Sequence, residues 1–534
     1  DSYATNEIPT MLASNWNRNS HIHLFLTHRY NLGFHRKVPM TKEEIEAKKF
    51  AMQAKKDNKE TPKKKKHKGR DDDEEDEDEE EDEQPEQTFA GRPDDAKIAG
   101  DDTARNDTTL TAQNLTLTVA EADSLAAARG AHTPDTAWLK TEYVPVTSFI
   151  HTAQFDTHER IYQAYASPEK YYANMYLAEE AARGDSIHDI TKTLRLRNTL
   201  VVSMREGFNR WMVAGIKLFA ASDLRRHTLP DTLYTLSTKT LHNLSVGAQI
   251  SRRQGRILHY SATAEACVAG DELGALKVDA SIDLNFPLWR DTMTLVARGF
   301  FHNEKPNYYM RHYHSKHYWW DDDLSKQQHT RIEAMLDYRK TRTSLRFVAD
   351  MLTNHTYFAS SYDTDPQLFY TNNTVAVRQA GSPISILTAS IDQRFTLGPV
   401  NWETRLAWQK STNQQVVPVP ALNIYTNLYL KFRIAKVLHT QLGCDMRYFT
   451  SYEAPLYVPG IGQFAVQEQQ QRVSIGNYPI VNLYANFNLK GTRFFVVYSH
   501  GNAALFSAKR SFLTPHYPLN NAVLRLGLCW NFYN

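Results

Sequence analysis

Apolar and polar residues alternate along this chain with a period of two. Between positions 522 and 532 the even positions are Ala, Leu, Leu, Leu, Trp and Phe, and the odd positions are mostly polar or small. The same alternation recurs in residues 20–37, 278–286, 422–434 and 481–490. Because successive side chains of a β-strand point to opposite faces, each segment predicts a strand with one apolar and one polar face.

These segments have the length of membrane-spanning β-strands, which need about 9–11 residues. A soluble antiparallel sheet also alternates, but here the pattern covers almost the whole chain without a domain boundary. The sequence has no window of about 18 consecutive apolar residues, which excludes a transmembrane helix. We therefore predict an all-β fold, a single-chain antiparallel transmembrane β-barrel that closes where the last strand meets the first.

Short and long connections alternate between the predicted strands. The short ones lie near Asp156–Glu159, Glu206–Asn209, Arg252–Gly255, Pro287–Asp291, Arg339–Arg342, Gly398–Asn401, Arg433–Lys436 and Lys490-Gly491. The long ones are the charged insert and those near Ser167–Ile190, Arg226–Asp231, Gly270–Gly274, Asn303–His329, His355–Ser382, Ser411–Pro420, Ser451–Tyr478 and Ser507–Asn521. In outer-membrane barrels short turns are periplasmic and long loops extracellular. The count predicts about 18 strands, with 16 as the lower alternative, and two periplasmic termini.

One insert interrupts the barrel. We expect a short periplasmic segment over residues 1–19 and a barrel over residues 20–534, broken by a charged extracellular loop over residues 38–138. This loop is Lys-rich at first and then contains thirteen consecutive carboxylates at Asp71–Glu83. Such blocks repel themselves and cannot bury apolar surface, so the insert should be largely disordered. Because the chain begins at Asp1 without an apolar leader, we expect a mature form whose secretory signal has been removed.

Charge is distributed unevenly between the insert and the barrel. Residues 38–138 contain 16 Lys and Arg against 27 Asp and Glu, a net charge of −11, whereas the whole chain carries +2. The remainder therefore carries +13. The charged residues expected on the polar, lumen-facing side of the strands are Arg29, Arg298, Arg394, Arg405, Arg433, Arg447, Arg525, Asp279, Asp283, Asp392, Glu403 and Asp445. Their basic excess should favour small anionic or polar solutes.

Other candidate chemistry is sparse. His312, His314 and His317 could bind a transition metal through imidazole nitrogens, but an aromatic loop at the lipid headgroups is the favoured interpretation, and we expect no metal and no cofactor. Ser148 and His151 are close in sequence, but their spacing puts them on opposite faces of a strand. No P-loop, dinucleotide-binding turn or nucleophile elbow appears. We therefore do not expect an enzyme.

Several segments resemble a known family. His28–Phe34 and Arg36–Pro39, then the charged insert, then Tyr143–Thr152, resemble the Putative porin family of Bacteroidota outer membranes, as do Pro479–Gly501 and Pro518–Tyr533. The resemblance implies an outer-membrane barrel and supplies no catalytic or ligand residues. Four Asp-Ser/Thr-small tripeptides in the insert look like the O-glycosylation acceptor motif of Bacteroidota, with acceptors at Thr103, Thr108, Ser124 and Thr136.

These observations predict a porin-like channel for passive diffusion of small polar or anionic solutes. The alternative is a non-conducting outer-membrane barrel that serves as an assembly partner of other envelope proteins. The expected partners are outer-membrane lipid and lipopolysaccharide, possible partners are other envelope proteins, and nucleic acid is not expected. The oligomeric state is not readable from the sequence. The predicted location is the bacterial outer membrane, with periplasmic termini and an extracellular acidic loop.

Overall fold

The computed structural model describes residues 14–60, 139–179, 184, 186–207, 212–288, 291–364, 370–468, 470, 472–504 and 512–531. The chain divides into two compact units, one made of Asp1–Phe34 and Pro145–Asn534 and the other of His35–Val144. In the described residues, no helix combines the length and the hydropathy that a membrane span requires. β-Strands dominate the described structure.

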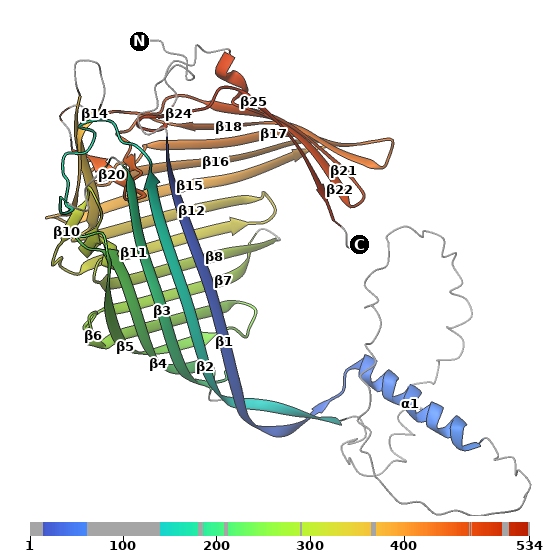
Figure 1. Ribbon diagram of the computed structural model, residues 1–534. Coiled ribbons are helices and arrows are strands. Elements are labelled where there is room, and N and C mark those ends of the chain that lie inside the picture. The colour runs from blue at the N-terminus through green and yellow to red at the C-terminus, as the bar shows by residue number, and fades with distance from the viewer. Residues whose placement is uncertain are drawn as a thin grey trace, which may run out of the picture. The chain divides into compact units, whose positions relative to one another are not determined.

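The first unit is built on one seventeen-stranded sheet (Figure 1). Its strands are β1 (Asn15–Pro39), β2 (Leu139–Ala164), β3 (Ile187–Met204), β4 (Gly215–Pro230), β5 (Leu236–Arg252), β6 (Leu258–Gly270), β7 (Leu276–Leu288), β8 (Asp291–Glu304), β11 (Gln327–Tyr338), β12 (Thr343–Thr353), β15 (Ile384–Leu397), β16 (Val400–Ser411), β17 (Leu422–Ile434), β18 (Leu438–Phe449), β21 (Ile480–Leu489), β22 (Thr492–Ser499) and β25 (Val523–Trp530). Each strand pairs with its neighbours in this order, and the pairs with a resolved register are antiparallel.

The predicted turn at Asp156–Glu159 is wrong, because β2 runs without a break from Leu139 to Ala164. It pairs with β3 throughout this region, with Asp156 opposite Arg195 and Glu159 opposite Lys192. The cluster of charges resembles a turn in the sequence. In the strand, however, these charges find partners on neighbouring strands, such as His23 of β1 for Asp156. The other seven short turns lie where they were predicted.

Losing one turn changes the strand count and the topology. The sheet has seventeen strands rather than the predicted even number. Ser14 accepts a hydrogen bond from Tyr165 at the end of β2 where the long loops lie, so β1 starts at the long-loop end. β25 ends at the short-turn end, opposite the start of β22. The start of β1 and the end of β25 therefore lie at opposite ends of the sheet, whereas the prediction of two periplasmic termini was based on an even number of strands.

The odd number of strands also changes the end of the sheet at which the insert is attached. β1 ends and β2 begins at the short-turn end of the sheet, so the connection 40–138 leaves the sheet together with the short turns and not with the long loops. β1 and β25 also run in the same direction. In the described residues β25 pairs with β22 alone, so β1 and β25 form the two edges and the predicted closure between them is not among the strand pairs.

The described part of the insert contains one helix, α1 (Lys42–Glu60), where disorder was predicted. A capping box begins it, because the Thr41 amide donates to the Glu44 carboxylate at 2.8 Å and the Glu44 amide donates to the Thr41 hydroxyl at 3.3 Å. Lys140 forms an ion pair of 2.5 Å with Glu44. The thirteen-carboxylate run and residues 1–13 lie outside the described residues.

The long connections contain structure of their own. Their elements are α3 (Tyr308–Arg311), β9 (His312–His314), β10 (Trp319–Asp321), β13 (Thr356–Thr364), β14 (Tyr370–Gln379), β19 (Leu456–Val458), β20 (Gln463–Gln467), η3 (Gly501–Ala504), β23 (Phe512–Thr514) and β24 (Tyr517–Pro518). β13 and β20 pair in parallel, with Ala359 opposite Val466, and join the connections after β12 and β18 into one sheet of the order β14-β13-β20-β19. We call the connections 305–326, 354–383 and 450–479 the loop cap.

The alternation of faces makes a prediction about stability. Leu428 is 53% exposed on the apolar face of β17, whereas Asn427 lies on the other face between Glu403 and Asp445. Leu428→Lys should cost about 2–4 kcal/mol of unfolding free energy if the residue lies near the bilayer midplane, measured by urea unfolding in lipid vesicles. Asn427→Lys should be mild, because its ammonium group meets carboxylates. Equal costs for the two variants would contradict the face assignment.

Candidate functional site

The charged residues predicted to face a lumen share one face of the sheet. Residues directly opposite each other on paired strands have side chains on the same face. Arg405 of β16 lies opposite Asp392 of β15 and Tyr425 of β17, and Tyr425 lies opposite Arg447 of β18. The same comparison along the other strand pairs puts eleven of the candidates on one face, which we call the polar face. Arg29 also lies there, because its guanidinium donates a hydrogen bond to Ser148 of this face.

Four of the five predicted acidic residues of the polar face have partners, and Asp283 forms no ion pair or hydrogen bond within the described residues. Among the predicted residues, Asp392 forms an ion pair with Arg405, and Glu403 accepts a hydrogen bond from the Tyr429 hydroxyl at 3.1 Å. Asp445 accepts from the Asn482 amide at 2.9 Å. Asp279 lies 3.1 Å from a ring nitrogen of His302. These contacts tie the carboxylates to groups on neighbouring strands.

Sequence reasoning missed a second set of ion pairs on the polar face. Asp223 of β4 binds Arg195 at 2.7 Å and Arg225 at 2.9 Å. Three further pairs are Arg331–Asp350 at 2.6 Å, Arg346–Glu333 at 3.0 Å and Arg197–Glu265 at 2.9 Å. The signal that could have found them is the odd-position alternation of β3 and its partner strands. Their pairing depends on register, which the sequence alone did not supply.

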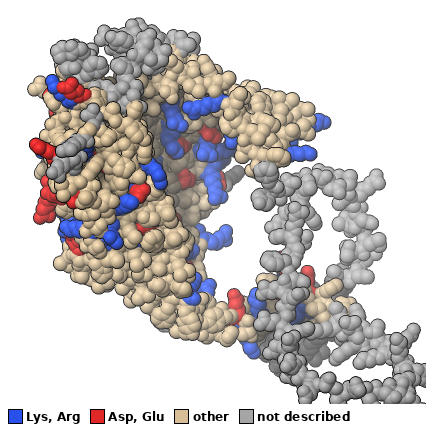
Figure 2. Space-filling model, in the orientation of Figure 1, with Lys and Arg blue, Asp and Glu red and all other residues tan. Residues whose placement is uncertain are grey.

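Several arginines of the polar face form no ion pair within the described part of the chain. These are Arg298, Arg394, Arg433, Arg447 and Arg525. The Arg447 guanidinium lies 5.8 Å from the ring centroid of Tyr425. A hollow of about 320 Å³ beside Arg298 is lined by Ser281, Phe300 and Arg331, among others. Figure 2 shows Lys and Arg side chains, with some Asp and Glu, in the hollowed part of the surface.

The short turns add basic groups at one end of the sheet. Exposed basic residues in or beside these turns are Arg205, Arg253, Arg256, Arg339, Lys340, Arg342, Arg433, Lys436 and Lys490. The acidic Glu206 in the same region accepts hydrogen bonds from the backbone amides of Arg253 and Gln254 at 2.7 and 2.6 Å. We call this set of basic residues the basic rim.

The loop cap is attached to the polar face through Arg160 of β2. Its guanidinium donates to the carbonyl oxygens of Pro459 and Gly460 at 2.8 and 2.9 Å and to the Tyr313 hydroxyl at 3.2 Å. Gly462 has a φ of +65°, and a Cβ there would lie 2.7 Å from the Arg160 Nε atom. Loops that follow the eighth and fourteenth strands of the sheet therefore meet at its second strand, across the long-loop end.

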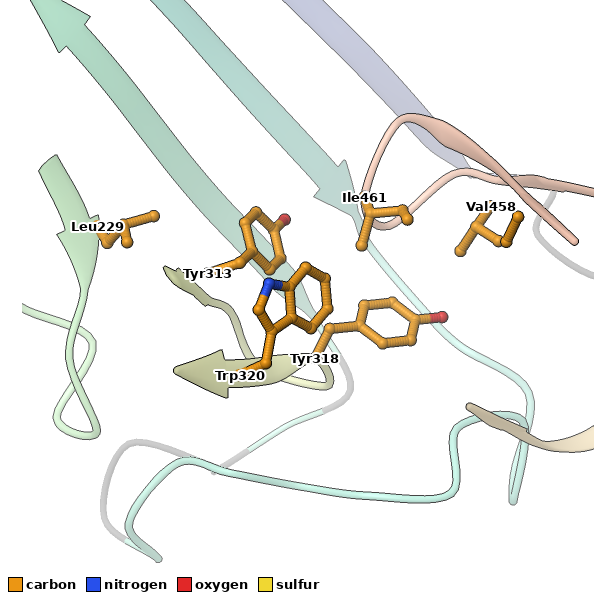
Figure 3. Packing of buried hydrophobic residues seen from close by; sticks show 7 residues of the cluster. Leu229, Tyr313, Tyr318, Trp320, Val458 and Ile461 are labelled. Carbon is orange, nitrogen blue, oxygen red and sulfur yellow. The ribbon is translucent and has the colours of Figure 1, made fainter. Parts of the chain in front are cut away.

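An aromatic core holds the loop cap together (Figure 3). The buried residues Tyr313, Tyr318, Trp320 and Val458 pack together with Leu229, which belongs to the polar face of β4. The rings of Tyr313 and Trp320 stack with centroids 4.9 Å apart, and the Trp320 indole donates to the Tyr309 carbonyl at 3.1 Å. Burial raises the pKa of Tyr318 well above its usual value. The loop cap thus has a packed core of buried side chains, as a small domain has.

The structure does not bring the three predicted histidines together. His312 and His314 both contact Asp321, each at 2.9 Å. Burial raises the pKa of the Asp321 carboxyl, but hydrogen bonds from the two histidines outweigh it and bring the pKa below its usual value. His317 instead stacks on Tyr172 at 4.0 Å, and burial lowers its pKa to about 4. No group of three potential metal-binding side chains occurs among the described residues.

The remaining sequence candidates lie apart from any common site. Ser148 donates to Asn31 at 2.6 Å on the polar face, whereas His151 lies on the other face, 3.3 Å from the Asn198 side-chain oxygen. Their predicted placement on opposite faces is confirmed. The glycosylation candidates Thr103, Thr108, Ser124 and Thr136 lie outside the described residues.

Solved structures with a similar backbone include two receptors and one transporter. The siderophore receptor PirA from Acinetobacter baumannii has a TM-score of 0.47 and 10% identity, over 72% of this chain and 62% of that chain. The copper transporter OprC has a TM-score of 0.45 and 11% identity, over 73% and 65%. The ferric enterobactin receptor PfeA has a TM-score of 0.44 and 11% identity, over 67% and 57%. This chain spans about six tenths of the length of these proteins.

The family of the chain is established by its sequence as a whole. No curated protein matches it. The model of the Putative porin family matches residues 1–534, which is the entire chain, in agreement with the resemblance of the segments around the insert. Together with the seventeen-stranded sheet and its single polar face, this match defines the protein class. The chain belongs to the Putative porin family and is an outer-membrane β-barrel protein.

Proposed function

We propose that this protein is an outer-membrane channel, without catalytic activity, through which small anionic or polar solutes diffuse along the polar face. The observation that carries the proposal is the partition of charge on this face. Four of its five predicted acidic residues are held by ion pairs or hydrogen bonds, whereas five arginines form no ion pair within the described residues: Arg298, Arg394, Arg433, Arg447 and Arg525. The opposite face carries exposed leucines and would contact outer-membrane lipid and lipopolysaccharide.

The free arginines are sufficient to produce selectivity. A unit charge about 10 Å from a solute contributes about 0.4 kcal/mol in water before screening. Screening at physiological salt, where the Debye length is about 8 Å, reduces the sum over five charges to about 0.6 kcal/mol, which is roughly a threefold preference for a monovalent anion over a neutral solute. At low salt the preference should approach tenfold. The basic rim strengthens it by concentrating anions at the short-turn mouth.

The loop cap supports a second candidate function. Its packed aromatic core spans the long-loop end of the polar face, and Arg160 attaches it there through charge-assisted hydrogen bonds. A cap of this kind narrows the pathway. If it blocks the pathway completely, the protein is a non-conducting barrel that assembles with other envelope proteins. Conductance of the purified protein in planar bilayers distinguishes the two functions.

The membrane orientation follows from the rule that short turns face the periplasm. The long loops and the loop cap then face outward, and the insert 40–138 joins the barrel on the periplasmic side, since β1 and β2 reach it at the short-turn end. This replaces the predicted extracellular position of the acidic loop.

The first prediction concerns ion selectivity. Bilayer recordings in a KCl gradient should give a chloride-to-potassium permeability ratio above one, and this ratio should rise at low salt. Replacing Arg298 and Arg394 by Glu changes the wall by four charge units and should invert the preference. The control is Thr343→Glu, which lies opposite Gln393 on the other face of the sheet and should change the ratio little. Cation selectivity of the unchanged protein would contradict the proposal.

The second prediction concerns the loop cap. Arg160→Met removes the charge-assisted hydrogen bonds to the Pro459 and Gly460 carbonyls, which keep only the neutral donors Asn17 and Tyr313. This loss should cost the cap about 3 kcal/mol and raise amide exchange in residues 456–467 by about 100-fold. Bilayer conductance should rise in parallel. Arg160→Lys keeps the charge but loses the fork of donors, so it should be intermediate. Faster exchange without any conductance would favour the non-conducting barrel.

The third prediction concerns orientation. In a background without native cysteines, Leu273→Cys in a long loop should react with a membrane-impermeant maleimide on intact cells. Lys340→Cys in a short turn should react only after the outer membrane is permeabilised. Both residues are exposed, so the pair differs mainly in the side of the membrane. Labelling of Lys340→Cys on intact cells would show the inverse orientation.

A further inference from the structure

A row of polar side chains crosses the apolar face of the sheet. His151 of β2 lies opposite Leu200, Asn198 of β3 opposite Ser222, and His242 of β5 opposite Leu224, which places them on the face that carries leucines. His28 of β1 joins them, because its ring stacks on His151. We call His28, His151, Asn198, Ser222 and His242 the polar row. It crosses five neighbouring strands.

Contacts within the polar row use only part of its hydrogen-bonding capacity. The His28 and His151 rings lie 5.9 Å apart at an interplanar angle of 6°. A His151 ring nitrogen lies 3.3 Å from the Asn198 oxygen, and a His242 ring nitrogen lies 2.8 Å from the Ser222 hydroxyl. An imidazole has two such nitrogens and an asparagine amide has two donors besides its oxygen. Each histidine and the asparagine therefore retain groups that can bond outward.

The surroundings of the row are apolar. Along β3 the same face carries Leu194 on one side of Asn198 and Leu200, 62% exposed, on the other. Along β4 it carries Leu224 and Leu218, 58% exposed, on the two sides of Ser222. Hydrocarbon chains cannot form hydrogen bonds, so placing a polar side chain against the lipid tails costs free energy. The row therefore requires a polar neighbour within the membrane.

The same region of the surface is hollowed. A shallow depression of about 980 Å³ extends over β1 to β4 beside His28 and His151, and on this face its walls include Tyr30, Phe149 and Leu218. A depression of this size accepts several large apolar side chains. Protein interfaces within membranes often combine apolar recesses with polar groups that can form further hydrogen bonds. A surface covered only by lipid chains carries mainly leucine and other apolar side chains.

We propose that the polar row and this depression form the contact surface of a symmetric dimer with a second copy of this chain. Two copies inserted in the same orientation and related by a two-fold axis along the membrane normal present the row at the same depth. Imidazole, amide and hydroxyl groups both donate and accept, so the row is complementary to itself. Any other partner would have to carry matching groups at this depth on an unrelated sequence.

The test is cross-linking in native outer membranes and in vesicles made from the purified full chain. In a background where Cys267, Cys444 and Cys529 are replaced, Leu200→Cys beside the row should form a covalent dimer with a short bismaleimide. The matched control is Leu428→Cys on β17, exposed on the same face but far around the sheet. The dimer yield at Leu200→Cys should exceed that of the control at least tenfold.

Variants of the polar row then test whether cross-linking depends on contacts of this row or only on chance encounters of two copies. Adding His151→Leu and Asn198→Leu to Leu200→Cys should lower the dimer yield at least tenfold while the folded, heat-modifiable barrel persists, because leucine suits a lipid-facing surface. His151→Gln, which keeps a donor and an acceptor, should preserve the yield. Equal yields at the two cysteine positions, or a yield unaffected by the double replacement, would overturn the proposal. Cross-links to a different envelope protein alone would also overturn it.

Discussion

Backbone hydrogen bonding in hydrocarbon is the constraint on which the rest of this structure depends. Because lipid offers no donors or acceptors, each spanning strand must bond to its neighbours along its full length. The seventeen-stranded ladder fulfils this for its inner strands and fixes a register. The register in turn assigns every side chain to one of two faces. Leu428 and Asn427 are neighbours in sequence, yet the ladder sends one to the leucine-rich face and the other between Glu403 and Asp445.

The charge of the polar face and the loop cap are both consequences of that ladder. Cross-strand neighbours bring Asp223 to Arg195 and Asp350 to Arg331, which neutralises acids and leaves an arginine excess. The long connections lie at one end of the strands, where loops from distant strands meet at Arg160. A basic wall and a packed cap suit a narrowed pathway for anions. The cap also contains buried polar groups, such as Lys316, whose ammonium group donates hydrogen bonds to the backbone oxygens of Gly184 and Ser186.

The sequence predicted much of this architecture, because a period-two alternation reports directly on faces. It located seven of the eight short turns. The register puts the twelve charged candidates on one face of the sheet, and that this face lines a lumen stays a prediction. The prediction from sequence failed at Asp156, where a cluster of charged residues was interpreted as a turn although the alternation continues, and this single error made the predicted strand number even. Long-range contacts were beyond its reach: Arg160 and Gly460 are 300 residues apart, and no local pattern links them. The ion pairs likewise depend on register, which alternation leaves open by multiples of two residues.

The central claim is that the two faces of the sheet meet different solvents, lipid on one side and water on the other. Spin labels placed singly at each position of β17, from Leu422 to Ile434, would test it most directly in lipid vesicles. The account predicts that accessibility to oxygen peaks at even positions and accessibility to a water-soluble nickel chelate peaks at odd positions, with the two profiles out of phase. Profiles that rise and fall together, or that lack a period of two, would contradict it.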